Sequence, residues 1–323
     1  MSSSPEMEHA RRAELAVVGL GEIGGGLARY LAATGIRVAG FDIDAAARAR
    51  AVLAGVLACD SLGDAVDCAP LVVTSLPSES ALRAVYLDGD GLAAAGSRIT
   101  TCDLSTVSVA LAKALSKART AAGAAHVEGA LIGVGRDAEQ GNVHLLLAGT
   151  DAAIDALAPL LRAAGRGSTR FAEAGHANLA KILNNGIGQA TLAAIAEALA
   201  LARAVGLPCE PLVEAMIVGR GAGYSMVLER HGSNMARDAD GPGTAALALK
   251  DAQALAHALA EVPLTLPLLT ATARSMAEAV AKEGCQRQAV ALARWTARVA
   301  RSGAAEVDPS VRSDERSAKG PGR

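Results

Sequence analysis

The sequence has few aromatic residues and no excess of either charge. Phe, Trp and Tyr together make up 2% of its 323 residues, and 31 Lys and Arg stand against 33 Asp and Glu. Proteins that bind nucleic acids usually carry a basic patch or stripe, which a nearly neutral chain does not supply. We therefore expect no nucleic-acid partner.

Other chemical signatures are also missing. The five cysteines are widely spaced and odd in number, which suggests neither a disulfide framework nor a zinc site. The six histidines show no metal-ligand spacing, and no GxSxG or P-loop pattern is present, so we predict no metal site. Residues 1–12 lack the apolar core of a signal peptide, and no run of about 18 uncharged apolar residues follows. We expect a cytoplasmic protein without a membrane partner.

The order of apolar runs and helical patterns predicts two domains. Short apolar runs of buried-strand type alternate with helical patterns up to about residue 172, which is typical of an α/β domain with a doubly wound parallel sheet. From 173 to 301 the pattern is all helical, beginning with a long helix that joins the two domains. We expect a Rossmann domain at 13–172, a helical domain at 173–301, and disordered tails at 1–12 and 302–323.

A glycine motif follows the first predicted strand. Leu15–Val18 is an apolar run, and a helical pattern begins directly after the glycines. Gly-x-Gly-x-x-Gly between a strand and a helix predicts a dinucleotide site, because the backbone can approach a pyrophosphate at the helix N-terminus. The residues expected to bind the cofactor here are Gly19, Leu20, Gly21, Glu22, Ile23 and Gly24.

Asp42 closes the second predicted strand, 18 residues after Gly24. A carboxylate at this place accepts hydrogen bonds from the ribose 2′-OH and repels a 2′-phosphate, which favours NAD over NADP. The alternative is that Asp42 or Asp44 only caps the next helix, which begins near Ala45.

Polar and small residues follow two later strands. Leu76 and Pro77 come after one strand, and Ser105 and Thr106 after the next. Ligands bind at the carboxyl ends of parallel strands, so we expect Leu76, Pro77 and Thr106 to contact the cofactor and Ser105 the substrate. The alternative is structural: Pro77 starts a helix, and Ser105 or Thr106 caps one.

The stretch from Gly175 to Gly206 predicts the long inter-domain helix. Lys181 lies among apolar residues, and Asn185, four residues later, shares its helix face. Desolvation lowers the pKa of a lysine and makes it useful as an acid or base near neutral pH. The alternative is a surface lysine whose stem covers apolar neighbours.

These motifs together resemble the β-hydroxyacid dehydrogenases, which include 3-hydroxyisobutyrate dehydrogenase, 6-phosphogluconate dehydrogenase-like domains and tartronate semialdehyde reductase. The resemblance covers roughly residues 14 to 300 and is carried by GLGEIGGGLARYL, LVVTSLPSESALRAVYLDGDGL, DLSTVSVALAKAL, GHANLAKILNNGIGQATLAAIAEALALARAVGL and a later Lys-Asp pair. It implies an NAD(P)-dependent oxidoreductase that moves a hydride between nicotinamide and a small 3-hydroxy acid or semialdehyde. It further implies Lys181 as general acid/base, Asn185 as its catalytic partner, Asn184 as a substrate contact and Lys250 as a cofactor contact.

The substrate motif departs from the family. Where these enzymes usually carry DAPVSGG, this chain has EGALIGV, with Ile132 in place of the serine and Gly133 kept. Ile132 cannot donate a hydrogen bond to a carboxylate, and an unpaired buried carboxylate is costly. The segment looks more like that of imine reductases, although Lys181 is unusual for those enzymes. We still predict Ile132 and Gly133 as substrate contacts.

Three functions stay open. The first is a dehydrogenase for a small hydroxy acid, the second an imine or ketone reductase of the same fold, and the third a dinucleotide-binding protein without turnover. The alanine- and leucine-rich helical half needs a surface to pack against, which favours a homodimer or homotetramer.

Overall fold

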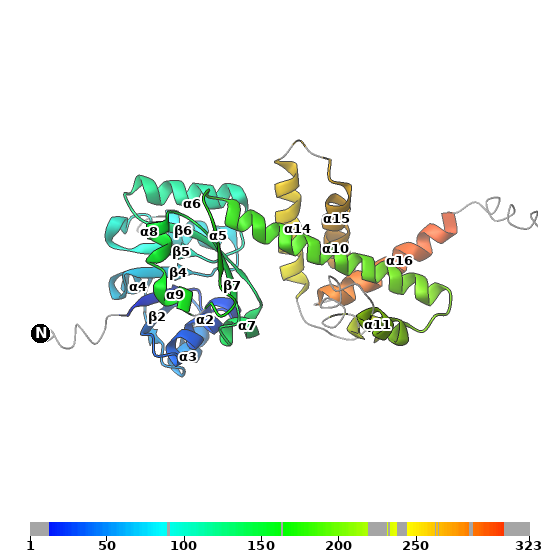
Figure 1. Ribbon diagram of the computed structural model, residues 1–323, viewed down its shortest axis with the longest axis horizontal. Helices are drawn as coiled ribbons and strands as arrows, with labels where there is room; N and C mark the ends of the chain where they lie inside the picture. The colour runs from blue at the N-terminus through cyan, green and yellow to red at the C-terminus, as the bar shows by residue number, and fades with distance from the viewer. Residues whose placement is uncertain are drawn as a thin grey trace, which may run out of the picture. The chain divides into compact units, whose positions relative to one another are not determined.

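The computed structural model describes residues 13–88, 91–162, 164–218, 231, 233–237, 244–261, 263, 265–283 and 287–306. The chain forms two compact units, Met1–Leu183 and Asn184–Arg323, and the boundary between them falls inside the long helix (Figure 1). Three predicted segments lie outside the described residues: the N-terminal tail 1–12, residues 307–323 of the C-terminal tail, and the glycine-rich segment 219–230.

The first unit is built on an eight-stranded sheet with the order β3-β2-β1-β4-β5-β6-β7-β8. The strands are β1 (Leu15–Val18), β2 (Val38–Phe41), β3 (Leu57–Ala58), β4 (Leu71–Thr74), β5 (Thr100–Asp103), β6 (His126–Ile132), β7 (His144–Ala148) and β8 (Ser168–Phe171). The six strands β1 to β6 are mutually parallel, which confirms the predicted Rossmann-type domain.

The far edge of the sheet differs from the prediction of a wholly parallel sheet. β7 pairs with β6 in the antiparallel sense, and β8 then pairs parallel to β7. Between β6 and β7 lies only the five-residue helix α7 (Gly135–Glu139), and a parallel crossover needs a dozen or more residues. The short connection therefore reverses the chain direction at this edge.

Helices cover both faces of the sheet because the strand residues alternate between them. Leu15 and Val17 pack in one apolar cluster with Leu27, whereas Ala16 and Val18 pack in another with Leu111. The helices of this unit are α2 (Glu22–Ala33), α3 (Ala45–Val52), α4 (Leu62–Cys68), α5 (Glu79–Leu87), α6 (Val109–Ala121), α7, α8 (Asp151–Asp155) and α9 (Ala158–Arg162), with the 3-10 turn η1 (Gly96–Arg98). Near-continuous apolar strands of this kind are expected when both faces are buried.

Two polar side chains, Arg119 of α6 and His126 of β6, are buried in the first unit. Arg119 is fully buried, and its guanidinium donates to the carbonyl oxygens of Leu92 at 2.6 Å and Ile99 at 2.7 Å. His126 shares a 2.9 Å hydrogen bond with Thr101 on the neighbouring strand. Desolvation, together with the nearby Arg119 charge, lowers the pKa of His126 to about 3.

This shift predicts a loss of stability in acid. In the unfolded chain a histidine takes up a proton below about pH 6.5, whereas folded His126 does so only near pH 3, so the folded state is disfavoured as the pH falls through this window. Within this window the free energy of unfolding falls by about 1.4 kcal/mol for each pH unit. We expect His126→Leu to flatten the decline in the free energy of urea unfolding between pH 6.5 and 4. Parallel declines in both proteins would show that His126 is not its source.

The second unit is helical. After α10 (His176–Ala204), which continues from the first unit, come α11 (Cys209–Val218), α13 (Ser233–Arg237), α14 (Ala245–Ala260), α15 (Pro267–Glu283) and α16 (Gln288–Glu306). The long helix predicted between Gly175 and Gly206 is confirmed, and α16 extends past the residue 301 expected from the sequence. Leu192, Ile195 and Leu199 of α10 belong to the apolar core of this unit.

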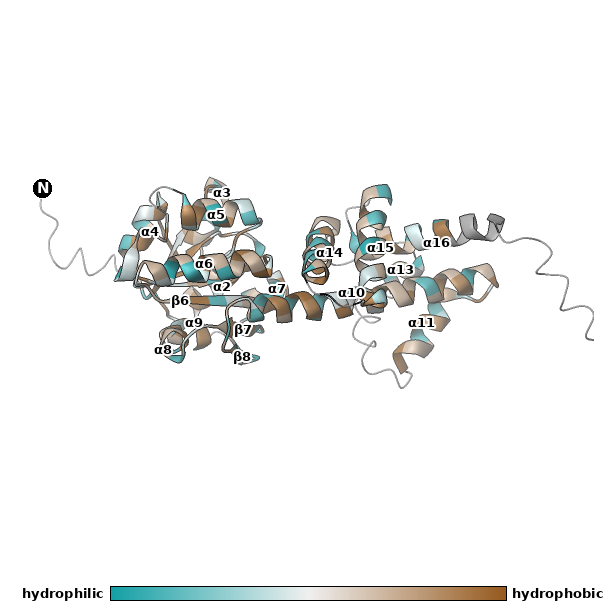
Figure 2. Ribbon diagram, turned by 90° about the horizontal axis from the view of Figure 1, so that it is seen from above, coloured by the Kyte–Doolittle hydropathy of each residue, from teal (hydrophilic) through white to brown (hydrophobic). Residues whose placement is uncertain are grey.

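By length and composition alone, α10 is long and apolar enough to cross a membrane. Figure 2 shows hydrophobic residues along much of this helix. Its packing in the core of the second unit accounts for part of this composition, since a core helix is also apolar.

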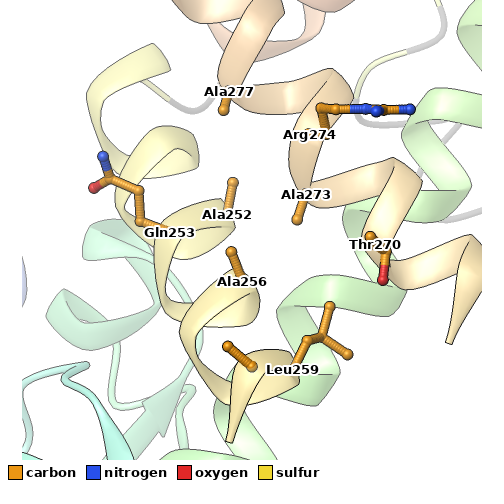
Figure 3. A pocket seen from close by; sticks show the side chains of 9 residues that line it. Ala252, Gln253, Ala256, Leu259, Thr270, Ala273, Arg274 and Ala277 are labelled. Carbon is orange, nitrogen blue, oxygen red and sulfur yellow. The ribbon is translucent and has the colours of Figure 1, made fainter. Parts of the chain in front are cut away.

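A cavity of about 430 Å³ lies between α14 and α15. Figure 3 shows alanines facing each other across it, with the side chains of Gln253 and Arg274 extending to either side. Its lining is mainly apolar.

Candidate active site

The glycine turn after β1 is built by close backbone packing. Gly19 has φ +94°, and a Cβ there would lie 2.3 Å from the carbonyl oxygen of Ser75. A Cβ on Gly24 would lie 2.1 Å from the carbonyl oxygen of Gly19. Both positions therefore need glycine for the fold of the protein itself, independently of any ligand.

Gly21 is different, because a Cβ there would meet nothing within 4 Å. It is the N-cap of α2, and no side chain caps the first turn of that helix. The free N–H groups and the positive end of the helix dipole are thus open to an anion. Leu20 comes directly before Gly21, and Glu22 and Ile23 begin α2, so the residues predicted to bind the cofactor form the turn and the first residues of the helix.

Asp42 lies at the end of β2, beside this turn. Its carboxylate accepts hydrogen bonds from the N–H of Leu20 at 2.6 Å and from the N–H of Asp44 at 2.8 Å. Asp44, and not Asp42, caps α3 by accepting from Ala46. Arg48 donates to the Asp42 carbonyl oxygen at 2.6 Å, so its guanidinium is directed to the backbone of this turn.

The ends of β4 and β5 meet next to the glycine turn. The Leu76 side chain would be 3.0 Å from a Cβ on Gly19, and the Leu76 N–H donates to the Ser105 hydroxyl at 2.9 Å. Pro77 is exposed and Thr106 half-buried at this edge. The order of the sheet changes direction between β1 and β4, which is where open α/β sheets bind their ligands.

Ser105 is placed differently from what its predicted substrate contact requires. Only 3% of it is exposed, and its hydroxyl accepts from Leu76 and donates to Asp103 at 2.7 Å. The hydroxyl therefore joins two strand ends. It does not cap a helix either, because Ser108 caps α6 and Ser78 caps α5.

The start of α10 is held by a residue from β6. The Glu128 carboxylate accepts hydrogen bonds from the N–H of Gly175 and from the backbone and side-chain N–H groups of Asn178, the latter two at 2.7 and 3.1 Å. Asn178 in turn accepts from the N–H of Val107 at 3.0 Å. These contacts connect α10 to β6 and to the segment that follows Thr106.

Lys181 lies one turn along α10 and is half-buried. Ile132, at the end of β6, packs in one apolar cluster with Ala177 and Ala180 of this helix. Gly133 follows with φ +146°, where a side chain is strained. Ile132 of the divergent substrate motif thus packs against the first turns of α10, the helix that carries Lys181.

Two residues of this region were not predicted as site residues, namely Glu128 and Asn178. The sequence does contain a signal, because the N-cap of α10 is Gly175, which has no side chain to cap the helix. A long helix without its own cap requires an acceptor from another element. Which element supplies it is not visible in the sequence.

The second unit holds the other predicted residues. The Asn185 side chain donates to the Asp251 carboxylate on α14 at 2.9 Å, and its oxygen accepts from the exposed Asn184 at 3.3 Å. Lys250, the neighbour of Asp251, is half-buried on α14. In the described part of the chain no cluster of His, Cys, Asp and Glu suited to a metal ion occurs.

Family models match most of the chain. The NAD binding domain of 6-phosphogluconate dehydrogenase matches residues 14–175, and the NAD-binding domain of NADP-dependent 3-hydroxyisobutyrate dehydrogenase matches residues 175–296. The chain belongs to the β-hydroxyacid dehydrogenase family. As a β-hydroxyacid dehydrogenase it is an NAD(P)-dependent oxidoreductase. The hydroxy-acid dehydrogenase and the imine or ketone reductase considered from the sequence are both oxidoreductases of this kind.

Relatives of this β-hydroxyacid dehydrogenase agree with that assignment. It is 31% identical over 219 residues to the NAD-dependent L-serine dehydrogenase of Pseudomonas aeruginosa, covering 67% of this chain and 72% of the relative. The 3-hydroxyisobutyrate dehydrogenase of Mycobacterium tuberculosis, solved with L-serine, has a TM-score of 0.78 at 26% identity, covering 87% of this chain and 98% of that one. An imine reductase of Myxococcus stipitatus solved with NAD⁺ has a TM-score of 0.59 at 21% identity, with 88% and 99% covered, and shares the fold.

Proposed function

We propose that this protein oxidises the primary alcohol of a small acid of the form HOCH2–CH(X)–COO⁻ to the aldehyde, or reduces the aldehyde. L-serine and 3-hydroxyisobutyrate, named for the relatives, share this skeleton and differ in X. The observation that carries the proposal is the position of Lys181 on a helix whose first turn is hydrogen-bonded to the strand-end segment beyond Thr106.

Lys181 serves as the acid/base in this proposal. Loss of hydride from the alcohol carbon requires loss of the hydroxyl proton, which the neutral amine accepts; the reverse reaction returns it. NAD(P) supplies the hydride acceptor when bound. The side-chain N–H group of Asn185 donates to Asp251, and its oxygen, which accepts from Asn184, has a second lone pair for an ammonium or hydroxyl donor.

Ile132 bears on the choice of X. It packs with Ala177 and Ala180 at the start of α10, where the family's serine would donate a hydrogen bond. An apolar contact at this place favours a substrate with an apolar group beside its carboxylate, such as the methyl of 3-hydroxyisobutyrate. It is also the observation that favours the alternative, a reductase for cyclic imines or ketones.

A substrate panel separates the two functions. The purified protein is assayed with NAD⁺ and NADP⁺ against L-serine and 3-hydroxyisobutyrate, and with the reduced coenzymes against cyclic imines and ketones. We expect turnover with a hydroxy acid. Turnover with imines or ketones alone would replace the proposal by its alternative.

We also propose a preference for NAD over NADP. The Asp42 carboxylate is fixed by the N–H groups of Leu20 and Asp44 beside the glycine turn, where it would repel a 2′-phosphate. We expect Asp42→Ala to lower the ratio of kcat/KM for NAD to that for NADP by at least about tenfold, or about 1.4 kcal/mol. Asp44→Ala, which removes the cap of α3 and an exposed ion pair with Arg50, is the matched control. An unchanged ratio in Asp42→Ala would mean that another group reads the ribose.

We further propose that the protein acts as a homodimer or homotetramer. Large apolar side chains near the C-terminal end of α10 are exposed, among them Leu201 at 66% and Val205 at 69%. Clusters of exposed apolar residues are typical of protein interfaces. Light scattering after size-exclusion chromatography should give twice or four times the mass of the chain, whereas the mass of a single chain would refute this proposal.

A further inference from the structure

Glu128 and Asn178 form a buried bridge between the substrate motif and the lysine motif, and neither residue is predicted as a site residue from the sequence. Glu128 is 2% exposed and Asn178 is fully buried. Three N–H groups donate to the Glu128 carboxylate, two of them from the backbone of the first turn of α10. All of its described partners are hydrogen-bond donors.

The bridge has a structural cost that a simple helix cap would avoid. Burying a carboxylate is expensive unless it is fully hydrogen-bonded, and a serine or aspartate at the N-cap would satisfy the helix locally. Here the N-cap is Gly175, and the acceptor comes from β6, 47 residues earlier in the chain. Asn178 then adds a link to Val107, directly after Thr106.

The geometry points to a role in the reaction: Glu128 and Asn178 are positioning residues that fix the first turn of α10 against β6 and the β5–α6 segment, and thereby hold Lys181 at the reacting group. This inference rests on the proposed role of Lys181 as acid/base. Lys181 is three residues after Asn178, so a tilt of the first turn moves its amine relative to the strand ends. Proton transfer is sensitive to such displacements.

The same bridge places the Glu128 carboxylate against the turn of α10 that precedes Lys181. Other charged groups around the start of α10 are Asp103, which is opposite Glu128 on β5, Lys113 of α6, whose side chain lies against Gly175, and the Glu173–His176 pair. Replacing Glu128 by glutamine changes only one of these charges and keeps the side-chain shape. A negative charge bonded to this turn favours the protonated form of the Lys181 amine, so its removal is expected to lower the pKa of Lys181.

The first test measures the protonation of Lys181 without any substrate. The protein is labelled briefly with acetic anhydride across a pH series, and acetylation of the Lys181 peptide is quantified by mass spectrometry. We expect Glu128→Gln to lower the labelling midpoint by about half a pH unit or more. Ser61→Ala removes the cap of α4, which follows β3 at the opposite edge of the sheet, and should leave the midpoint unchanged. An unchanged or raised midpoint in Glu128→Gln would overturn the inference.

The second test separates positioning from folding. Asn178→Ala keeps the Glu128 carboxylate bonded to the helix backbone but removes the link to Val107. If Glu128→Gln does not fold, Asn178→Ala alone tests the positioning role. With L-serine or 3-hydroxyisobutyrate, we expect its kcat to fall at least about tenfold while the Kd for NADH stays within twofold. A smaller fall would refute positioning. Full activity of Lys181→Ala would refute the proposed function. Impaired activity of Lys181→Ala together with full activity of Asn178→Ala would refute the positioning role and leave the bridge with a structural role only.

Discussion

Replacement of Lys181 by alanine is expected to lower kcat at least about 100-fold and to leave NADH binding unchanged. General acid–base groups contribute roughly 10²–10⁴-fold to enzymatic rates. Lys181 is half-buried on the second turn of α10, whereas the glycine turn that is expected to hold the coenzyme connects β1 to α2. Steady-state kinetics with the best hydroxy acid of the panel and fluorescence titration with NADH measure the two quantities.

A control and a rescue make this result specific. Lys117→Ala removes an exposed lysine of α6 and should keep full activity. Small primary amines added to Lys181→Ala should restore part of the rate, because they can accept the same proton from the cavity left by the side chain. Full activity of Lys181→Ala without added amine would remove Lys181 from the mechanism.

Gly21→Val is expected to weaken NADH binding at least tenfold without destabilising the protein. A Cβ on Gly21 meets no protein atom within 4 Å, so the folded state accommodates it. The added side chain instead occupies the space in which the pyrophosphate approaches the N-terminus of α2. Isothermal titration with NADH gives the affinity, and thermal unfolding gives the Tm.

Two other glycines serve as matched variants. Gly24→Val places its Cβ 2.1 Å from the Gly19 carbonyl oxygen and should unfold the domain, which separates packing from ligand approach. Gly63→Val, in α4, has only the Ser61 hydroxyl oxygen at 3.6 Å from its Cβ and should leave NADH binding unchanged. Unaltered NADH affinity in Gly21→Val would place the pyrophosphate elsewhere.

The sequence predicted those parts of the fold whose determinants are local. β1 coincides with the apolar run Leu15–Val18, and α10 with the long helical pattern, because burial on both faces and helical periodicity are written in consecutive residues. β8 was not predicted, since Ser168–Phe171 is exposed along most of its length and has no apolar run. The antiparallel direction of β7 depends on how the chain returns after a short helix, which residue patterns do not record.

The candidate site shows the same division. The glycine turn and Asp42 come together as predicted, because strand, turn and helix follow each other directly along the chain. The inward position of Ser105 and the bridge of Glu128 to Asn178 depend on residues 29 and 50 positions apart, respectively. Such pairings arise from the packing of whole elements, and a single sequence gives no measure of them.

The most direct test of the central claim is transfer of deuterium from substrate to coenzyme. L-serine and 3-hydroxyisobutyrate, each deuterated at the hydroxymethyl carbon, are incubated with NAD⁺ and the protein, and the reduced coenzyme is analysed by mass spectrometry. We expect one deuterium in each NADH formed, at a rate at least about 100-fold lower with Lys181→Ala. A protein that binds NAD⁺ but gives no deuterated coenzyme from either acid would contradict it.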